Sequence, residues 1–307
     1  MIRRSLGYLP FIICFLILYF SKTFGWLTSL NGAIQLLLFL FVVCIPAYVT
    51  KRMSYVDIGW PWGLVFIGII VLLFGEGYWI RKYIIGGIYL FSGLRMGVGA
   101  LVLLKKGHLN SELPRYKYQR KRWKKLEFTN LDISLQYEIL IQCFANVTFL
   151  ALPAFILANN PQEFFHSTEI LGYLLWILFF TVEHLADLQK QKFLKKAYLE
   201  NKKKQVCNVG LWKYSRHPNY FAEWMVWNSL IISSSYSLFY YYSNEKVLIW
   251  TGLAASLLYV SLIMYNTLVY YTGIIPSEYY SLKKRTNYVE YQKNTNMFFP
   301  KMPKTKK

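Results

Sequence analysis

The polar residues with the clearest chemical potential lie where a basic loop enters an apolar run. Pro218 suits the first turn of a helix, where its missing N–H group would be unpaired in any case, so His217 is the expected cap. The free N–H groups and positive dipole end of such a helix start, reinforced by Arg216, form a site for a phosphate or pyrophosphate. We therefore expect Arg216 and His217 to bind a phosphorylated cofactor.

Three further polar side chains follow along the first turns of this expected helix. Asn219, Tyr220 and Glu223 share one helical face, with Glu223 about 7 Å beyond the helix start. Taken singly, aromatic and basic residues at this level are typical anchors of a membrane helix. Anchoring does not require an amide and a carboxylate one turn apart on a buried face, and ionisable groups inside a membrane are candidates for function. The combination favours a cofactor site.

A second polar group lies where the preceding apolar run ends. Glu183, Asp187 and Lys190 lie on one helical face, where the carboxylates can accept hydrogen bonds from ribose hydroxyls or a carboxamide. A solvated helix end with an ion pair would have the same pattern. The sequence leaves both interpretations open, and all three residues are candidate cofactor ligands.

Arg95 is the third signal, about 15 Å from the end of its expected helix at Lys105. A cation at this depth must face a partner, and the candidates on other helices are Asp57, Glu183 and Glu223. A structural ion pair between Arg95 and Asp57 and a catalytic role for both residues are open alternatives. Because these groups all fall in the cytosolic halves of their helices, we predict that they converge on one pocket open to the cytosol.

The elements that must position these residues are membrane helices. The 307 residues are 55% hydrophobic and only 16% charged, which is too apolar for a soluble protein. Runs of about 17 to 25 apolar residues match the length that spans roughly 30 Å of hydrocarbon. Eight such runs lie near residues 7–21, 31–50, 59–75, 82–104, 139–158, 168–186, 218–242 and 247–271. The sequence predicts an all-α, polytopic transmembrane bundle of about eight helices (seven to nine), in a single domain over residues 1–307.

The net charge of +20 is distributed by topology. Thirty of the 35 Lys and Arg residues fall in alternate segments, which are the N-terminus, residues 51–52, 105–138 and 187–217, and the tail from residue 272. This positive-inside pattern predicts a multi-pass protein with both termini cytosolic, and attraction to anionic membrane lipids rather than to nucleic acid. Nothing in the sequence indicates a protein partner.

The sequence gives no sign of a metal centre or a soluble nucleotide-binding domain. Cys14, Cys44, Cys143 and Cys207 are not at metal-ligand spacing, so we expect neither a zinc site nor a disulfide framework. No G-x-G-x-x-G follows a strand pattern, and there is no Walker loop. A nucleotide would have to be held by helix ends and loops. Residues 186–204 are expected to continue the sixth helix beyond the membrane.

Over about residues 54–300 the sequence resembles the steroid 5-alpha-reductase superfamily, most closely its large uncharacterised bacterial-type branch of membrane proteins. The most specific part is Ser215-Arg-His-Pro-Asn-Tyr220 followed by Glu223. The other matching features are Asp57 with Trp60 and Gly63, Arg95, Glu112 with Pro114-Arg115-Tyr116, Glu183-x-x-Ala186-Asp187-x-Gln189-Lys190, Gly210-Leu211-Trp212, Thr272-Gly-Ile-Ile-Pro276, Tyr288-x-x-Tyr291 and Phe299-Pro300.

This resemblance implies a helical membrane reductase, an oxidoreductase acting on CH–CH groups. Such an enzyme encloses NADPH at the cytosolic ends of its helices and adds hydride to a carbon–carbon double bond conjugated to a carbonyl in a lipid-like, steroid or enone-type substrate. The cofactor region would be about residues 180–300. In matching positions Asp187, Arg216, Asn219 and Glu223 would hold the cofactor, and Asp57 corresponds to the substrate-side acid. One departure is Ala222, where the family usually has Gly.

The chemistry of that reaction suggests three catalytic candidates. Hydride delivery to an enone builds negative charge on the carbonyl oxygen, which a positioned acid stabilises. The cofactor supplies the hydride, and the protein supplies orientation and dryness. We take Asp57, Tyr220 and Arg95 as the catalytic candidates.

Two other functions are compatible with parts of the pattern. A membrane methyltransferase of the isoprenylcysteine or phospholipid type, which uses S-adenosylmethionine, has a similar Arg-His-Pro-x-Tyr run, but Asn219 together with Glu223 favours the reductase. The other alternative is a transporter or a non-catalytic lipid-binding protein, although a carrier is expected to place its polar groups near the midplane of the membrane. No residue chooses among sterol, other enone lipid, polyprenol and fatty acyl substrates.

Overall fold

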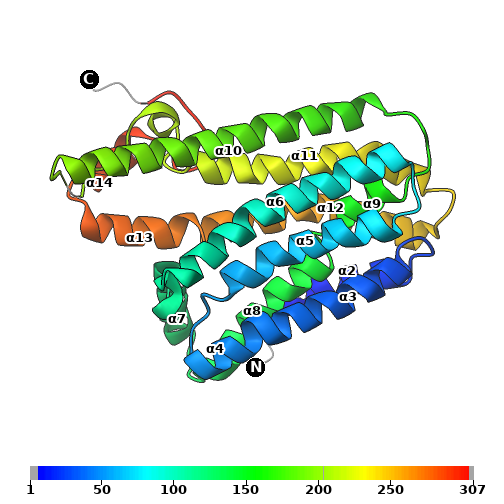
Figure 1. Cartoon of the computed structure of the whole chain (residues 1–307), viewed down its shortest axis with the longest axis horizontal. Helices are drawn as coiled ribbons and strands as arrows, with labels where there is room; N and C mark the ends of the chain where they lie inside the picture. The colour runs from blue at the N-terminus through cyan, green and yellow to red at the C-terminus, as the bar shows by residue number, and fades with distance from the viewer. Residues whose placement is uncertain (1–5, 203, 304–307) are drawn as a thin grey trace. The chain divides into compact units, whose positions relative to one another are not determined.

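The computed structural model describes residues 6–202 and 204–303, which form helices and connecting loops without a strand (Figure 1). Within these residues, six helices are long and apolar enough to cross a membrane. They are Gly25–Thr50, Val56–Phe74, Trp79–Lys105, Leu131–Ala158, Ser167–Leu199 and Val247–Lys284. The expected all-α bundle of an integral membrane protein is confirmed.

Two of the eight expected spans do not reach this length and apolarity. The first falls on η1 and α2 (Leu9–Tyr19), within the shorter apolar helix Leu6–Tyr19. The seventh falls on α11 (Pro218–Tyr240), a continuous helix that is not among the six. The reason is visible in the sequence of α11, because Asn219, Glu223 and several serines lower its hydropathy.

The chain divides into two compact units. The first unit comprises the described residues up to Glu169 together with Ile231–Val260, and the second comprises Ile170–Leu230 and the described residues from Ser261. The first unit contains α2, α3 (Gly25–Phe39), η2 (Leu40–Cys44), α4 (Ile45–Thr50), α5 (Val56–Phe74), α6 (Trp79–Lys105), η3 (His108–Asn110), α7 (Pro114–Lys125), α8 (Leu131–Val147) and α9 (Leu152–Ala158), with parts of α10, α11 and α12.

Small residues let α5 and α6 approach closely. A Cβ atom added to Gly93 would lie 2.7 Å from the carbonyl oxygen of Pro61, and one added to Gly68 would lie 3.0 Å from that of Gly86. These are backbone contacts, which only glycine permits. Membrane helices commonly associate through such small residues.

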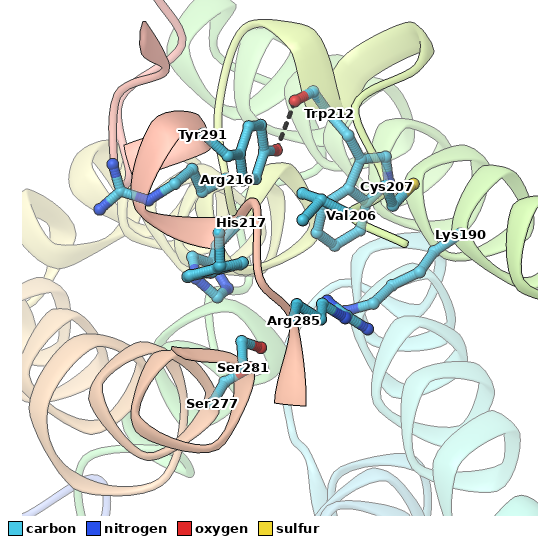
Figure 2. A pocket seen from close by; sticks show the side chains of 11 residues that line it. Lys190, Val206, Cys207, Trp212, Arg216, His217, Ser277, Ser281, Arg285 and Tyr291 are labelled. Carbon is cyan, nitrogen blue, oxygen red and sulfur yellow. Dashed lines mark hydrogen bonds between the residues drawn. The ribbon is translucent and has the colours of Figure 1, made fainter. Parts of the chain in front are cut away.

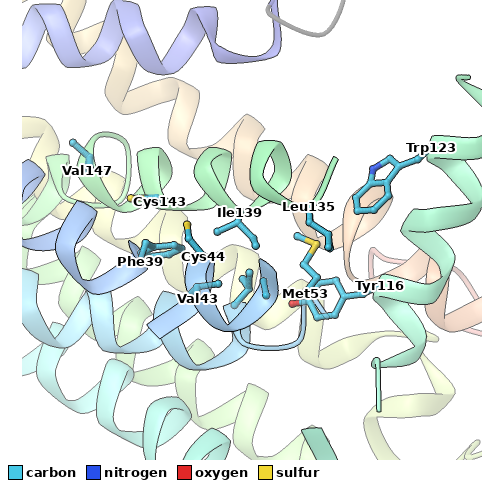
Figure 3. Close-up of a cluster of buried hydrophobic side chains, with 12 residues drawn as sticks. Phe39, Val43, Cys44, Met53, Tyr116, Trp123, Leu135, Ile139, Cys143 and Val147 are labelled. Atoms are coloured by element: carbon cyan, nitrogen blue, oxygen red, sulfur yellow. The ribbon is translucent and has the colours of Figure 1, made fainter. Parts of the chain in front are cut away.

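A buried cluster of the first unit joins α7 to the spans around it (Figure 3). Tyr116 and Trp123 from α7 pack with Leu135 and Ile139 from α8 and with Met53 from the loop before α5. Burial of large aromatic side chains is among the stronger apolar contributions to packing. It fixes α7 against the ends of the spans.

The second unit carries most of the sequence-predicted cofactor residues. It contains α10 (Ser167–Leu199) from Ile170 onward, η4 (Gly210–Lys213), the start of α11, the end of α12 (Val247–Asn266), η5 (Thr267–Tyr271), α13 (Ile274–Lys284) and α14 (Tyr288–Asn294). Helix α10 continues past its apolar part to Leu199, which confirms most of the expected extension over residues 186–204. The second unit has a small core cluster that consists of Val269, Ile274 and Phe298.

Candidate functional site

Two hydrogen bonds to α10 fix the loop that precedes α11. The side-chain oxygen of Gln189 accepts a hydrogen bond from the N–H of Leu211 at 2.9 Å, and the indole of Trp212 donates to the carbonyl of Ala186 at 2.9 Å. Gly210 has φ +54°, and a Cβ there would lie 2.4 Å from the Gln189 side chain. Only glycine fits this turn, because it accepts a left-handed conformation and leaves room for Gln189.

The C-terminal segment closes the same loop from another direction. The hydroxyl of Tyr291 on α14 donates to the carbonyl of Trp212 at 2.5 Å, and Ser215 donates through its Oγ to the carbonyl of Phe298 at 2.8 Å. The N–H of Arg216 donates to the carbonyl of Asn296 at 2.8 Å. Motifs far apart in the sequence therefore form one structure around the start of α11.

Helix α11 begins at Pro218, as predicted, and His217 occupies the cap position. The carbonyl of His217 accepts a hydrogen bond from the N–H of Phe221 at 3.1 Å. The His217 ring is buried, and its Nε2 lies 3.2 Å from Glu278 Oε1. The ring also stacks on that of Tyr220, with 5.5 Å between the ring centroids. Burial lowers the pKa of His217, and this outweighs the opposing effect of Glu278. The ring is neutral at pH 7.

Arg216 is held by internal partners. Its Nε donates to Glu278 Oε1 at 2.7 Å and Nη2 donates to Glu278 Oε2 at 3.2 Å, which is a bidentate ion pair. Its Nη1 donates to the carbonyls of Gln292 and Thr295 at 3.1 and 2.5 Å. The guanidinium is 9% exposed and ties the start of α11 to α13 and α14. A phosphate contact from Arg216 would have to be shared with these partners.

The two polar groups identified in the sequence meet on α10 and α11. The Asn219 Nδ2 donates to Asp187 Oδ1 at 3.1 Å. The Asn219 Oδ1 is buried and accepts no hydrogen bond from the part of the chain that the structure describes. Glu183 is buried one turn before Asp187 on α10, and Glu223 is half-buried and accepts from the indole of Trp227 at 3.0 Å. Neighbouring turns of α10 and of α11 therefore offer hydrogen-bond acceptors.

A pocket of the second unit lies beside these residues, with an empty volume of about 270 Å³ counting the part open to solvent (Figure 2). Lys190 from α10 and Arg285 from the end of α13 line it, and their side chains reach towards one another. Lys190 Nζ lies 4.4 Å from the centroid of the Trp212 ring. Among the described residues, no carboxylate forms an ion pair with either cation. Lys190 and Arg285 therefore bring two positive charges to the pocket, and the charge of Asp187 acts on Lys190 from the preceding turn of α10.

Hydroxyl groups complete the lining of this pocket. Ser277 and Ser281 lie one turn apart on α13, and Tyr288 adds a phenol whose pKa burial raises, so that it stays protonated. Cys207 is buried in the wall, and burial raises the pKa of its thiol. The described residues contain no group of three or more His, Cys, Asp and Glu side chains arranged to hold a metal ion. The pocket offers cations and O–H donors, which is the chemistry of an anion site.

Sequence reasoning did not identify Arg285 or Glu278. Glu278 lies on α13 and Arg285 at its end. Glu278 is more than sixty positions after Arg216 in the sequence. Glu278 is an isolated carboxylate two residues after the Thr272–Pro276 motif, in a segment otherwise rich in cations. That isolation is the signal that would have marked it as a partner for a buried cation.

Asp57 and Arg95 belong to the first unit. Asp57, in the first turn of α5, accepts hydrogen bonds from Arg115 Nη2 and from the Tyr116 hydroxyl, both on α7. Burial, and next the charge of Asp57, raise the pKa of Tyr116 well above its ordinary value, so Tyr116 remains a donor. Arg95 is half-buried on α6. The expected convergence of Asp57 and Arg95 with the residues of the second unit stays a prediction.

The fold and the site define a helical integral membrane protein with a polar, cationic pocket beside its seventh apolar segment. The chain belongs to the family described as Protein of unknown function (DUF1295), whose model matches residues 40–295. It is similar to the Uncharacterized protein C594.04c of Schizosaccharomyces pombe (strain 972 / ATCC 24843), with 26% identity over 276 residues that cover 82% of this chain and 74% of that protein. No solved structure matches the chain.

Proposed function

We propose that the protein is a membrane reductase that uses NADPH to reduce a carbon–carbon double bond of a lipid-like enone. The observation that carries the proposal is the cationic pocket of the second unit. Two cations in one partly enclosed hollow, without a paired carboxylate among the described residues, attract an anion with more than one charge. The phosphate groups of a nucleotide supply such an anion.

The neighbouring residues fit the other parts of a dinucleotide. Ser277 and Ser281 can donate to phosphate oxygens beside Arg285. Asp187 can accept from ribose hydroxyls, and the buried Asn219 Oδ1 is an acceptor for a carboxamide N–H. When bound, NADPH supplies the hydride, and the residues of this chain bind and orient it.

The pocket also favours the reductase over the methyltransferase. S-adenosylmethionine carries a sulfonium cation and no phosphate, so a pocket that contains Lys190 and Arg285 repels its reactive part. The resemblance of Ser215–Tyr220 and Glu223 to the steroid 5-alpha-reductase superfamily supports the same choice. The hydrophobic character of the chain is compatible with a substrate that arrives from the membrane.

We assign the role of the acid to Tyr220 rather than to Asp57. Asp57 accepts hydrogen bonds from both Arg115 and Tyr116, so both of its oxygens already have partners on α7. Tyr220 is half-buried on α11, where its ring stacks on that of His217, and a phenol is a hydrogen-bond donor. Its hydroxyl would stabilise the negative charge that develops on the carbonyl oxygen of an enone.

We further propose that both termini and the segments 105–138 and 187–217 are cytosolic, as the positive-inside pattern indicates. NADPH is then available on the side where the pocket opens. Because the four native cysteines are buried, a Lys202→Cys variant can be labelled alone at an exposed position. We expect labelling from the cytosolic side, and labelling from the opposite side would contradict this orientation.

A thermal-shift comparison tests the proposed function. NADPH at a hundred times its dissociation constant should stabilise the purified protein by roughly 2.7 kcal/mol. S-adenosylmethionine at the same concentration should leave the melting temperature unchanged. Stabilisation by S-adenosylmethionine alone would favour the methyltransferase, and stabilisation by neither ligand would remove the support for a nucleotide enzyme.

A further inference from the structure

Helix α7 is a cationic helix between two membrane spans, and the proposed reaction does not use its charge. Seven of its twelve residues are Lys or Arg, and none is acidic. Such a segment has three general explanations, which are a solvated surface, a contact with an acidic macromolecule and a contact with anionic lipid. The structure separates them by what each face of α7 contacts.

One face of α7 is fixed inside the first unit. Tyr116, Gln119 and Trp123 are buried, and Figure 3 shows the two aromatic side chains within the apolar cluster. Arg115 and Arg120 are directed to internal partners, because they donate to Asp57 and to Glu112. These contacts set the rotation of α7 about its axis.

The opposite face presents mainly cations. Lys117, Lys124 and Lys125 are exposed and lie within about a third of the helix circumference. No large hydrophobic side chain of α7 is exposed, so this face cannot insert into hydrocarbon. Its binding chemistry is that of several ammonium groups at fixed spacing.

The ends of the neighbouring spans place this face at the level of the lipid headgroups. Residues 106–113 and 126–130 are the only connections between α7 and the spans α6 and α8, so α7 stays beside the surface where both spans end. Arg120 donates to the carbonyl of Lys51, directly after the span Gly25–Thr50. Glu112 accepts from Ser54 Oγ at 2.6 Å, just before α5. The end of the span Gly25–Thr50 is thus tied to α7, and the start of α5 is tied to the connection before α7.

We propose that the exposed lysines of α7 bind the anionic headgroups of phospholipids and so hold this edge of the first unit against a charged membrane surface. A lipid headgroup fits better than a soluble acidic partner. The buried cluster around Tyr116 and Trp123 and the short connections to α6 and α8 hold the lysines at the membrane surface. Each lysine near an anionic surface contributes a factor of about five to the binding constant.

Lipid quenching of a fluorophore tests this proposal on the full chain. A Leu126→Cys variant places a single label at an exposed position next to α7, because the native cysteines are buried. The protein is placed in bilayers that contain phosphatidylglycerol or phosphatidylcholine with a nitroxide near the headgroup end of the acyl chain. We expect phosphatidylglycerol to be at least about five times more effective per mole, and this preference to vanish at about 1 M salt.

A matched pair of variants assigns the preference to α7. Replacement of Lys117, Lys124 and Lys125 by Gln should abolish it, whereas replacement of the exposed Lys192, Lys195 and Lys196 of α10 by Gln removes the same charge and should preserve it. Equal quenching by the two lipids in the labelled Leu126→Cys protein with all its lysines would overturn the proposal and favour a soluble acidic partner. An equal loss in both variants would overturn the assignment to α7, because a general charge effect would then explain the preference.

Discussion

Two arginines of the second unit have opposite surroundings although both line the same pocket. Arg216 has a bidentate carboxylate and two carbonyl acceptors, whereas Arg285 has no ion pair among the described residues. A buried charge with all its partners holds a structure together, and removing one partner leaves a charge uncompensated. A charge that faces a hollow without a partner attracts a ligand. The type of a residue thus says less about its function than its partners do.

The largest effect is expected at Glu278. The Glu278→Gln variant should lose about 3–5 kcal/mol of unfolding free energy, because Arg216 would remain buried without its carboxylate. Denaturant unfolding of the full chain measures this loss. Glu200→Gln is a matched control, because Glu200 is exposed and pairs with the exposed Lys196 and Lys202, and it should leave stability almost unchanged. Equal effects of the two variants would contradict a structural role for Glu278.

Asp57 should show a smaller effect of the same kind. The Asp57→Asn variant should lose about 1–3 kcal/mol, since it weakens the contacts with Arg115 and Tyr116 but keeps an acceptor. Asp132, which pairs with Lys51 at the surface, is the control, and Asp132→Asn should have little effect. NADPH affinity should be unchanged in both variants. A loss of NADPH affinity in Asp57→Asn would place Asp57 in the cofactor site instead.

The smallest effect is the pH dependence from His217. Its pKa is lowered in the folded protein, so the unfolded chain binds more protons below about pH 6.5, and stability falls as the pH decreases. One histidine changes stability by at most about 1.4 kcal/mol per pH unit. The melting temperature of the wild type and of His217→Gln between pH 7.5 and 5.5 measures this component. The two proteins would lose stability equally if His217 did not contribute.

The fold followed from the sequence where one physical requirement dominates. Apolar runs of bilayer length marked the spans, because unpaired backbone groups are too costly inside hydrocarbon to allow anything but helices. Pro218 marked the start of α11 because it fits the first turn alone. Helix α7 was missed, since its density of cations resembles a loop. The spacing of Tyr116, Gln119 and Trp123 is the helical signal that its charge concealed.

The partners in the candidate site could not be predicted in the same way. Glu278 and Arg285 meet Arg216 and Lys190 only after α13 and α14 fold back onto the loop before α11. No local pattern contains that contact, because it depends on tertiary structure. The sequence identified Arg216 as the phosphate ligand from its position before Pro218. Its bonds to Glu278 instead make Lys190 and Arg285 the better candidates.

The most direct test of the account is an NADPH titration of Lys190→Gln and Arg285→Gln, with Lys284→Gln as the control. Lys284 is exposed, is adjacent to Arg285 and does not line the pocket, so its replacement removes the same charge outside the proposed site. Loss of one charge-assisted contact should weaken NADPH binding by about 1.5–3 kcal/mol, or roughly ten- to a hundredfold, in the two pocket variants. The control should bind NADPH like the wild type. Unchanged affinity in both pocket variants, or an equal loss in Lys284→Gln, would contradict the assignment of this pocket to the phosphate groups of the cofactor.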